Sequence, residues 1–420
     1  MKSFEKLYLI GIEAVISVLL LSFPVMMLTV KSGMNAVFLL LLLLAILVWL
    51  RPPAMIAPAK WIRDWTPYVA AMFAMTASIF ISQTYHQNFS AIHYDSPARY
   101  WLAIPIFLLL YRLDLRVFWS LQLAFPIAAI VGWVFARDIG NGVTLPMLDK
   151  IRYGDSMLLF SMLSLLSIDW LGRDTLYLRA LKWAGFLAGF LATFQSGTRG
   201  ALLAIPVFVA IYLLSRGVRL SFRTALASLI LGVIVVFGAY LSNDTVQLRL
   251  QNMATEVATY EQGNRDTSTG IRWQLYIAAI EIISEQPIFG VGPGGYALQM
   301  ESMADAGKIT PVAAELGRGE VHNDILKKTA DLGVFGFAAI CAVYLVPLWL
   351  FGKANKSSLM SVKCAGLMGL VFVSGFMVFG LTAEVLNLSM TIAFYSFTVA
   401  VLLAYCYNIH HVEQNIVDLR

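Results

Sequence analysis

Apolar runs of about 20 residues recur along this 420-residue chain, and short segments that carry most of its charges separate them. A bilayer core about 30 Å thick needs around 20 apolar residues per helix, so each run is long enough to cross a membrane. Apolar residues make up 59% of the chain and charged residues 13%, whereas soluble domains hold about 45–50% and about 25%. The sequence therefore predicts an all-α polytopic membrane protein. It excludes a cytosolic enzyme, a secreted domain and a disordered chain.

Charges and clusters of proline and glycine bound the apolar runs, and they predict about twelve transmembrane helices. The expected spans are 8–30, 34–50, 66–83, 99–111, 117–135, 154–171, 180–198, 200–215, 224–242, 326–351, 363–382 and 388–408. The chain then divides into three parts. Residues 1–242 hold the first nine helices, residues 243–325 form one long loop, and residues 326–420 hold the last three helices and a tail.

The basic residues indicate how the chain crosses the membrane. If both termini are cytoplasmic, the inner segments hold seventeen Lys and Arg residues and the short outer loops hold six. Lysine and arginine collect in cytoplasmic loops, so this orientation is favoured and the long loop faces outward. The net charge of +5 is spread over short loops and does not form one basic face. This distribution favours membrane lipids as partners and argues against nucleic acid.

The long outer loop, 243–325, is expected to be partly helical, because segments 247–262 and 271–287 both have amphipathic character. Apolar residues recur at helical spacing in the second segment: Trp273, Tyr276, Ile277, Ile280 and Ile283. This face is expected to pack on the membrane domain, and insertion into the membrane interface is the alternative. Gly290, Gly292 and Gly295 satisfy G-x-G-x-x-G. They follow a helix instead of a strand, which predicts a helix-terminating turn and not a nucleotide site.

A small set of charges stands at the outer boundary of the predicted spans: Arg137, Arg152, Arg199, Arg265 and Arg272, with His322 where the loop re-enters the membrane. A guanidinium stays charged and binds phosphate through paired N–H groups, so arginines at this depth suit a phosphate or diphosphate. Snorkelling, or pairing with Asp138, Asp155 or Asp266, is the alternative for any one of them. Arg199 has no acid beside it, and a charge that is expensive at this depth indicates a functional site.

His322, in G-E-V-H-N-D-I-L, is the candidate general base. A neutral histidine can accept a proton near pH 7, and Glu320 could orient its ring. No second His or Cys stands at ligand spacing, so neither a metal nor another cofactor is expected. The cysteines lie inside apolar runs, without disulfide or metal spacing, and are expected to be packing residues: Cys341, Cys364 and Cys406.

Three groups of motifs around this loop together resemble the O-antigen ligase family, WaaL. They are S-G-T-R-G-A-L-L-A at 196–204, G-I-R-W-Q-L-Y with Q-P-I-F-G-V-G-P-G-G-Y within 270–296, and H-N-D-I-L with L-G-V-F-G within 322–336. The resemblance covers about residues 190–345. It matches Arg199 to the family arginine at the end of a span, Arg272 to its loop arginine and His322 to its loop histidine. The wider superfamily also holds O-antigen polymerases and bacterial protein O-oligosaccharyltransferases.

The resemblance implies a GT-C type glycosyltransferase of the bacterial inner membrane, with its active site facing the periplasm and no need for a metal. It would transfer a glycan from undecaprenyl diphosphate to a sugar hydroxyl of lipid A-core in lipopolysaccharide biosynthesis, with inversion of the anomeric carbon. His322 would act as base, and Arg199 and Arg272 would bind the diphosphate. Arg152 and Arg265 join this set on charge and topology alone.

Other functions stay open at this point. A polymerase and a protein O-oligosaccharyltransferase share the donor and differ in the acceptor. A transporter or flippase of an anionic lipid belongs to a different class, and it usually has ionisable residues or broken helices near the middle of the membrane. Here the ionisable groups concentrate at one face, which favours an enzyme. A structural scaffold would not require this placement of arginines and histidine.

Overall fold

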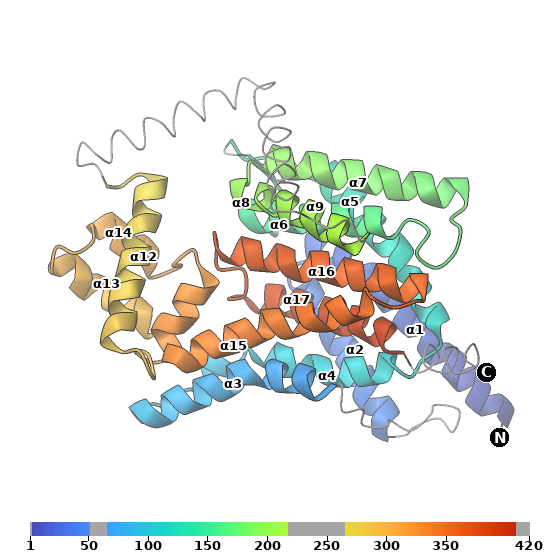
Figure 1. Cartoon of the computed structure of the whole chain (residues 1–420), viewed down its shortest axis with the longest axis horizontal. Coiled ribbons are helices and arrows are strands. Elements are labelled where there is room, and N and C mark those ends of the chain that lie inside the picture. Colours follow the sequence, from blue (N-terminus) through green and yellow to red (C-terminus); the bar gives the residue numbers. More distant parts are fainter. Residues whose placement is uncertain (1, 51–64, 141, 217–264, 409–420) are drawn as a thin grey trace.

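The computed structural model describes residues 2–50, 65–140, 142–216 and 265–408, and it is mostly helical. The side chains of residues 2–6 and of Arg199 lie outside this description. Long helices run side by side along the longest axis of the molecule (Figure 1). Three short helices lie together at one end of this bundle, and we call them the cap: α12 (Ser268–Glu285), α13 (Gly295–Asp305) and α14 (Pro311–Gly317).

The bundle contains the remaining described helices. They are α1 (Lys2–Thr29), α2 (Gly33–Leu50), α3 (Thr66–His86), α4 (Ala98–Leu110), α5 (Leu121–Val134), α6 (Lys150–Leu166), α7 (Leu176–Ser196), α8 (Arg199–Leu202), α9 (Ala204–Ser215), α15 (Asp324–Ala354), α16 (Met360–Gly380) and α17 (Ser389–Cys406), with the 3₁₀ helices η2 (Ala91–Tyr94) and η3 (Leu115–Ser120). Strands β1 (Arg137–Asp138) and β2 (Val143–Thr144) pair antiparallel, with Arg137 opposite Thr144. Helix α1 begins and α17 ends at the end of the bundle away from the cap (Figure 1).

Six of the described helical segments are long and apolar enough to cross a membrane: Leu7–Thr29, Gly33–Leu50, Leu115–Val134, Asp324–Ala354, Met360–Gly380 and Ser389–Cys406. Helix α4 and the segment Gly200–Ser215 are apolar but shorter. Helices α3, α6 and α7 occupy the predicted spans 66–83, 154–171 and 180–198 and are more polar. These are the helices of a multi-pass membrane protein. The count of twelve stays a prediction, and the expected span at 224–242 lies outside the described residues.

Helix α17 is the centre of the bundle, and every residue from Thr391 to Cys406 is buried. It packs against α2, α4, α15 and α16. A helix that is apolar on all sides is stable only where it is covered on all sides. The ring centroid of Phe394 lies 5.3 to 6.3 Å from those of four phenylalanines on three other helices: Phe23, Phe160, Phe372 and Phe376. The connection that precedes α17 is therefore attached to a buried helix in the centre of the bundle.

Small residues bring α6 and α7 close together. A β-carbon added at Gly189 would lie 2.7 Å from the carbonyl oxygen of Met157, so a larger residue there would force the helices apart. At the cap end of the pair, Thr198 Oγ1 donates to the carbonyl oxygen of Lys150 at 2.8 Å. The first turn of α6 and the start of α8 are consequently neighbours.

The glycine-rich segment after α12 forms a turn, as expected. Gly290 and Gly292 have positive φ angles of 64° and 93°, which a residue without a β-carbon adopts at little cost. The turn docks against a break in α15 at Gly333, where φ is 64° and ψ is −151°. A β-carbon at Gly333 would collide with the carbonyl oxygen of Ile288. The segment thus locks the cap onto the bundle.

The cap has a small apolar core of its own, and one prediction about α12 is wrong. The residues that α12 buries are on another face: Ile271, Leu275, Ala278, Ala279 and Ile282. Trp273, Ile277 and Ile280 are 56%, 45% and 57% exposed, although they were expected to pack on the membrane domain. Apolar residues lie all round α12, so their spacing does not select a face. The adjacent alanines let α13 and α14 approach closely, and a tryptophan does not. The expected helix at 247–262 lies outside the described residues.

Candidate functional site

The predicted site residues come from separate parts of the chain, and several of them lie round one loop. This loop, residues 381–388, joins α16 to α17 at the cap end of the bundle. Arg152, in the first turn of α6, donates from Nη2 to Asn387 Oδ1 at 3.2 Å. The hydroxyl of Tyr276, on α12, is shared between the carbonyl oxygens of His322 at 3.0 Å and Leu381 at 3.2 Å. The 381–388 loop therefore connects the bundle to the cap at the position of His322.

His322 has a positive φ angle of 63°, which is uncommon for a residue with a β-carbon. It lies directly before α15, whose first turn is capped by Asn323 Oδ1 accepting from the N–H of Leu326 at 3.0 Å. On the other side, the Tyr276 hydroxyl holds the His322 carbonyl. A strained residue of this kind persists where its surroundings impose the conformation, and such residues cluster at functional sites.

Glu320 lies beside the His322 ring. Glu320 Oε1 is 3.3 Å from His322 Nδ1, at ion-pair distance but without the alignment of a hydrogen bond. The two side chains are 24% and 22% exposed, so substrate can still reach the ring. A carboxylate next to Nδ1 favours the tautomer that carries its proton on Nδ1, which leaves Nε2 as the acceptor.

A second glutamate, Glu384, completes a pair of backbone hydrogen bonds with Glu320. The N–H of Glu384 donates to Glu320 Oε1 at 2.7 Å, and the N–H of Val321 donates to Glu384 Oε1. Burial raises the pKa of Glu384, and the charge of Glu320 adds to this effect. Burial also acts to raise the pKa of Glu320. However, the His322 ring, the Glu384 N–H and the charge of Arg152 outweigh burial and lower that pKa. Glu320 is therefore kept ionised beside His322.

A third acid, Asp324, ties the start of α15 to the same loop. Its buried carboxylate accepts hydrogen bonds from the N–H of Leu386 at 3.2 and 3.3 Å and from the Tyr344 hydroxyl at 2.9 Å. Sequence reasoning singled out neither Asp324 nor Glu384. Yet Glu384 is the sole acid between Asp331 and Glu413. Because a charge is costly to bury in so apolar a stretch, its presence there indicates a functional residue.

Arg152 is the predicted arginine that the structure brings most clearly to this site. Its Nη1 pairs with Asp149, and its side chain is 18% exposed. The alternative expectation that it pairs with Asp155 does not match the structure, since both carboxylate oxygens of Asp155 are buried without a hydrogen bond to any described residue. The Arg152 Nε is likewise buried without a partner in the described part of the chain. One donor of Arg152 is therefore unsatisfied in the interior of the protein.

The other predicted arginines differ in their contacts with the 381–388 loop and its neighbours. Arg272 is half-buried one helical turn before Tyr276, and its charge opposes the effect of burial, which raises the pKa of the Tyr276 hydroxyl. Arg265 precedes α12 with an exposed side chain, and no hydrogen bond or ion pair among the described residues joins it to the 381–388 loop. Arg137 is exposed in β1.

Arg199 begins α8. Its neighbour Gly200 packs so closely against the 381–388 loop that a β-carbon there would collide with Thr382 Oγ1. The backbone of Arg199 therefore lies next to this loop. The Arg199 side chain is outside the described residues, so its contact with a diphosphate stays a prediction.

A cavity of about 290 Å³ lies next to these residues, between α3, the turn after α12, α15 and the 381–388 loop. Polar and charged side chains supply much of its lining: His93, Lys327, Lys328, Asp331, Glu384 and Asn387. Its size and polarity suit a hydroxylated group such as a sugar. In the described part of the chain, no group of three or more His, Cys, Asp or Glu side chains is arranged to hold a metal ion.

Two comparisons with known proteins give matches. The family model described as O-Antigen ligase matches residues 184–341, which run from α7 to the middle of α15 and include Arg199, Arg272 and His322. An uncharacterized protein of Haemophilus influenzae is 25% identical over 293 residues, which cover 66% of this chain and 71% of that protein. This match supports membership of the chain in the O-antigen ligase family.

Proposed function

We propose that this protein is an O-antigen ligase, which transfers a glycan from undecaprenyl diphosphate to a sugar hydroxyl of lipid A-core. The observation that carries the proposal is the meeting of Arg152, Glu320 and His322 at the 381–388 loop, with Arg272 close by through Tyr276. This arrangement puts cationic donors and a base at one end of a membrane bundle. Transfer from a lipid diphosphate to a hydroxyl needs both.

The arginines would stabilise the leaving group. As the bond between the anomeric carbon and the diphosphate oxygen breaks, its electron pair stays on the diphosphate. Fixed cations aimed at this growing charge stabilise the transition state more than the ground state, which is the condition for acceleration. Arg272 makes no ion pair with a described residue, and the Arg152 side chain is 18% exposed beside Asn387. Arg199 and Arg265 complete the proposed set, Arg199 on the position of its backbone and Arg265 on charge alone.

His322 would activate the acceptor. Nε2 takes the proton of the attacking sugar hydroxyl as the new C–O bond forms, and the ionised Glu320 stabilises the imidazolium that results. A positioned base contributes about 10²–10⁴-fold to such a step. Attack from the face opposite the diphosphate inverts the anomeric carbon, and the reaction needs no metal. The cavity of about 290 Å³ next to Glu384 is the proposed place for a sugar of the acceptor or donor.

Purified protein with a polyprenyl-diphosphate glycan and three alternative acceptors tests this function. We expect product with lipid A-core, but not with a second lipid-linked glycan or with a pilin-like protein. Product with the second glycan alone would show a polymerase, and product with the protein alone would show an O-oligosaccharyltransferase. Absence of covalent product with every acceptor, together with movement of the donor across vesicles, would show a flippase. A site facing the periplasm of the bacterial inner membrane is part of the proposal.

A further inference from the structure

A second pair of cavities lies at the opposite end of the bundle from His322. There η3, the α6–α7 connection, the start of α16 and the end of α17 enclose a cavity of about 980 Å³. Its lining includes Arg116, Trp119, Arg173, Met360 and Tyr405. Helices α16 and α17 have their other ends at the 381–388 loop. The cavity is therefore separated from the candidate active site by the length of the bundle.

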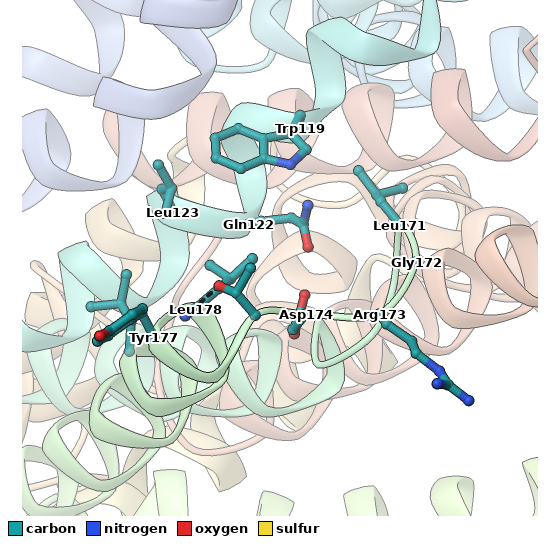
Figure 2. A pocket seen from close by; sticks show the side chains of 11 residues that line it. Trp119, Gln122, Leu123, Leu171, Gly172, Arg173, Asp174, Tyr177 and Leu178 are labelled. Carbon is teal, nitrogen blue, oxygen red and sulfur yellow. Dashed lines mark hydrogen bonds between the residues drawn. The ribbon is translucent and has the colours of Figure 1, made fainter.

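A smaller cavity of about 420 Å³ continues from the first one between α5 and α7. The two share Trp119, Leu171, Gly172 and Arg173. The walls of the smaller cavity are mainly apolar, and Figure 2 shows Trp119 and Leu123 on one side of it and Leu178 on the other. The joined space thus has a charged part near Arg116 and an apolar part along two membrane helices.

The two acids that line these cavities, Asp169 and Asp174, are already paired with basic side chains. Gln122 and Asp174 point toward each other in Figure 2, and Lys182 Nζ binds both, at 2.7 Å from Gln122 Oε1 and at 2.9 and 3.0 Å from the two Asp174 oxygens. Asp169 accepts two hydrogen bonds from Arg179, at 2.9 and 3.0 Å.

Two arginines on the larger cavity are not neutralised. The guanidinium groups of Arg116 and Arg173 are exposed, and neither makes an ion pair or hydrogen bond with a described residue. In Figure 2 the Arg173 side chain extends away from Asp174 and Gln122. Neither guanidinium is therefore paired with a side chain of the described residues, and the nearby Asp114 carboxylate accepts the backbone N–H of Arg116 at 2.8 Å.

We propose that the joined cavities bind one anionic phospholipid, with its phosphate between Arg116 and Arg173 and an acyl chain between α5 and α7. Basic pockets between transmembrane helices on the cytoplasmic side bind anionic headgroups, and the distribution of basic residues predicts that this end of the bundle is cytoplasmic. Trp119 is half-exposed at the junction of the two cavities, and tryptophan favours the depth of the lipid headgroup. A free phosphate would leave the apolar cavity unused. The proposal does not depend on the transferase assignment.

Native mass spectrometry of the full-length protein in detergent tests this site, with phosphatidylglycerol as the anionic probe. Phosphatidylethanolamine is the zwitterionic comparison, because its ammonium group offsets the charge of its phosphate. We expect Arg116→Gln with Arg173→Gln to weaken phosphatidylglycerol binding by about 25-fold, since each cation near a lipid surface contributes about 1 kcal/mol and 1.4 kcal/mol is tenfold. Arg116→Lys with Arg173→Lys should keep most of the affinity. Arg137→Gln, which removes an exposed charge at the other end of the bundle, should change nothing.

Three results would overturn the proposal. The first is equal retention of phosphatidylglycerol by the Gln variant, and the second is equal binding of phosphatidylethanolamine by the wild type. The third is displacement of phosphatidylglycerol by inorganic phosphate.

A further variant tests the placement of the acyl chain. Leu181→Trp narrows the apolar cavity and should lower the affinity for phosphatidylglycerol while both arginines remain. Unchanged affinity would contradict the placement of the acyl chain. Both arginines are exposed and unpaired among the described residues, so the Gln variant should melt at the wild-type temperature without added lipid.

Discussion

His322 is held in a left-handed backbone conformation by contacts on both of its sides. Tyr276 binds its carbonyl oxygen, and Asn323 caps the helix that follows it. A catalytic ring must keep its position within about 0.5 Å to be effective. The neighbouring carboxylate of Glu320 then sets which nitrogen carries the proton. Backbone strain, helix cap and acid together make this histidine a fixed base, and a surface histidine would have none of these restraints.

Replacing His322 by alanine should abolish product formation while leaving the donor bound. The reason is that the ring acts on the acceptor proton and the arginines hold the diphosphate. We expect a loss of about 10²–10⁴-fold in kcat, measured by product formation in detergent, with donor affinity measured separately by direct binding. Unchanged turnover would remove His322 from the mechanism.

Replacing Arg272 or Arg199 by alanine should have the complementary effect. Each variant loses a cation proposed for the diphosphate, so the affinity for the lipid-linked donor should fall together with turnover. Arg318→Ala is a matched control, because Arg318 lies in the cap and pairs with Glu301 on the surface at 3.0 Å. Normal donor binding in both Arg272→Ala and Arg199→Ala would count against the diphosphate assignment.

The two glutamates of the site should act on stability in opposite pH windows. The raised pKa of Glu384 means that the folded protein binds more protons than the unfolded chain above the ordinary glutamate value of about 4.3, so stability falls as pH rises there. The lowered pKa of Glu320 adds stability above about pH 4.3, which is lost as pH falls through the lowered value. Melting temperatures in detergent measure this. Glu384→Gln should reduce the fall in melting temperature as pH rises above about 4.3, and Glu320→Gln should reduce the fall in melting temperature as pH drops below about 4.3. The reverse assignment would contradict this account.

Sequence reasoning could identify several site residues because charge is scarce in this chain. A cation such as Arg152 is expensive near a bilayer, so its presence at the end of an apolar run indicates a role. The same argument, applied to acids, would have found Glu384. What it could not provide is the 381–388 loop as the meeting point, because the contacts of this loop with Tyr276 and Arg152 join residues more than one hundred positions apart. Arg265 shows that charge alone can also select a residue that the structure does not join to the site. Its charge does not indicate how far it lies from the 381–388 loop.

At the scale of elements, a buried lysine joins α5 and α7 at the end of the bundle away from the cap. Lys182 is fully buried on α7, and Asp174, just before that helix, is almost so. Lys182 Nζ also binds Gln122 on α5 and the carbonyl oxygen of Ser167 at 2.6 Å. The start of α7 is thereby fixed to α5 and to the end of α6.

Breaking this pair on one side should be costly. Lys182→Met leaves the Asp174 carboxylate buried without its cation, which typically costs about 3–5 kcal/mol of the free energy of unfolding. The double variant Lys182→Met with Asp174→Leu removes both charges and should be more stable than the single variant. Thermal unfolding in detergent measures both. A double variant that is less stable than Lys182→Met would show that the pair is not the source of the cost.

For α12, the predicted range of the helix agrees with the structure, but the predicted buried face does not. Its predicted range, 271–287, agrees closely with Ser268–Glu285, because helix length and ends depend on local signals such as Thr267, whose side chain caps Gly270. The buried face depends on partners. Ile271 and Ile277 are equally apolar, and the shape of α13 and α14 decides which of them is covered. No local pattern contains that information.

At the scale of the whole molecule, the chemistry and the proposed lipid site lie at opposite ends of one bundle. The carboxylates, His322 and the cap occupy one end, and the cavities beside Arg116 and Arg173 occupy the other. Helices α6, α7, α16 and α17 run between them. Ionisable groups at both ends and an apolar centre round α17 are expected of a helix bundle whose two ends face water on opposite sides of a membrane.

This separation predicts the accessibility of single cysteines. The background would replace Cys341, Cys364 and Cys406, and a cysteine would then be introduced at exposed Gln299 in the cap or at exposed Tyr177 beside the smaller cavity. In spheroplasts, a membrane-impermeant maleimide should label Gln299→Cys at once and Tyr177→Cys after lysis alone, because the distribution of Lys and Arg turns the cap outward. A cysteine kept at Cys406, which is buried, should stay unlabelled throughout and controls for unfolding. The opposite order would reverse the orientation and move the proposed transfer to the cytoplasm. Labelling of both sites before lysis would contradict a bundle that spans the membrane.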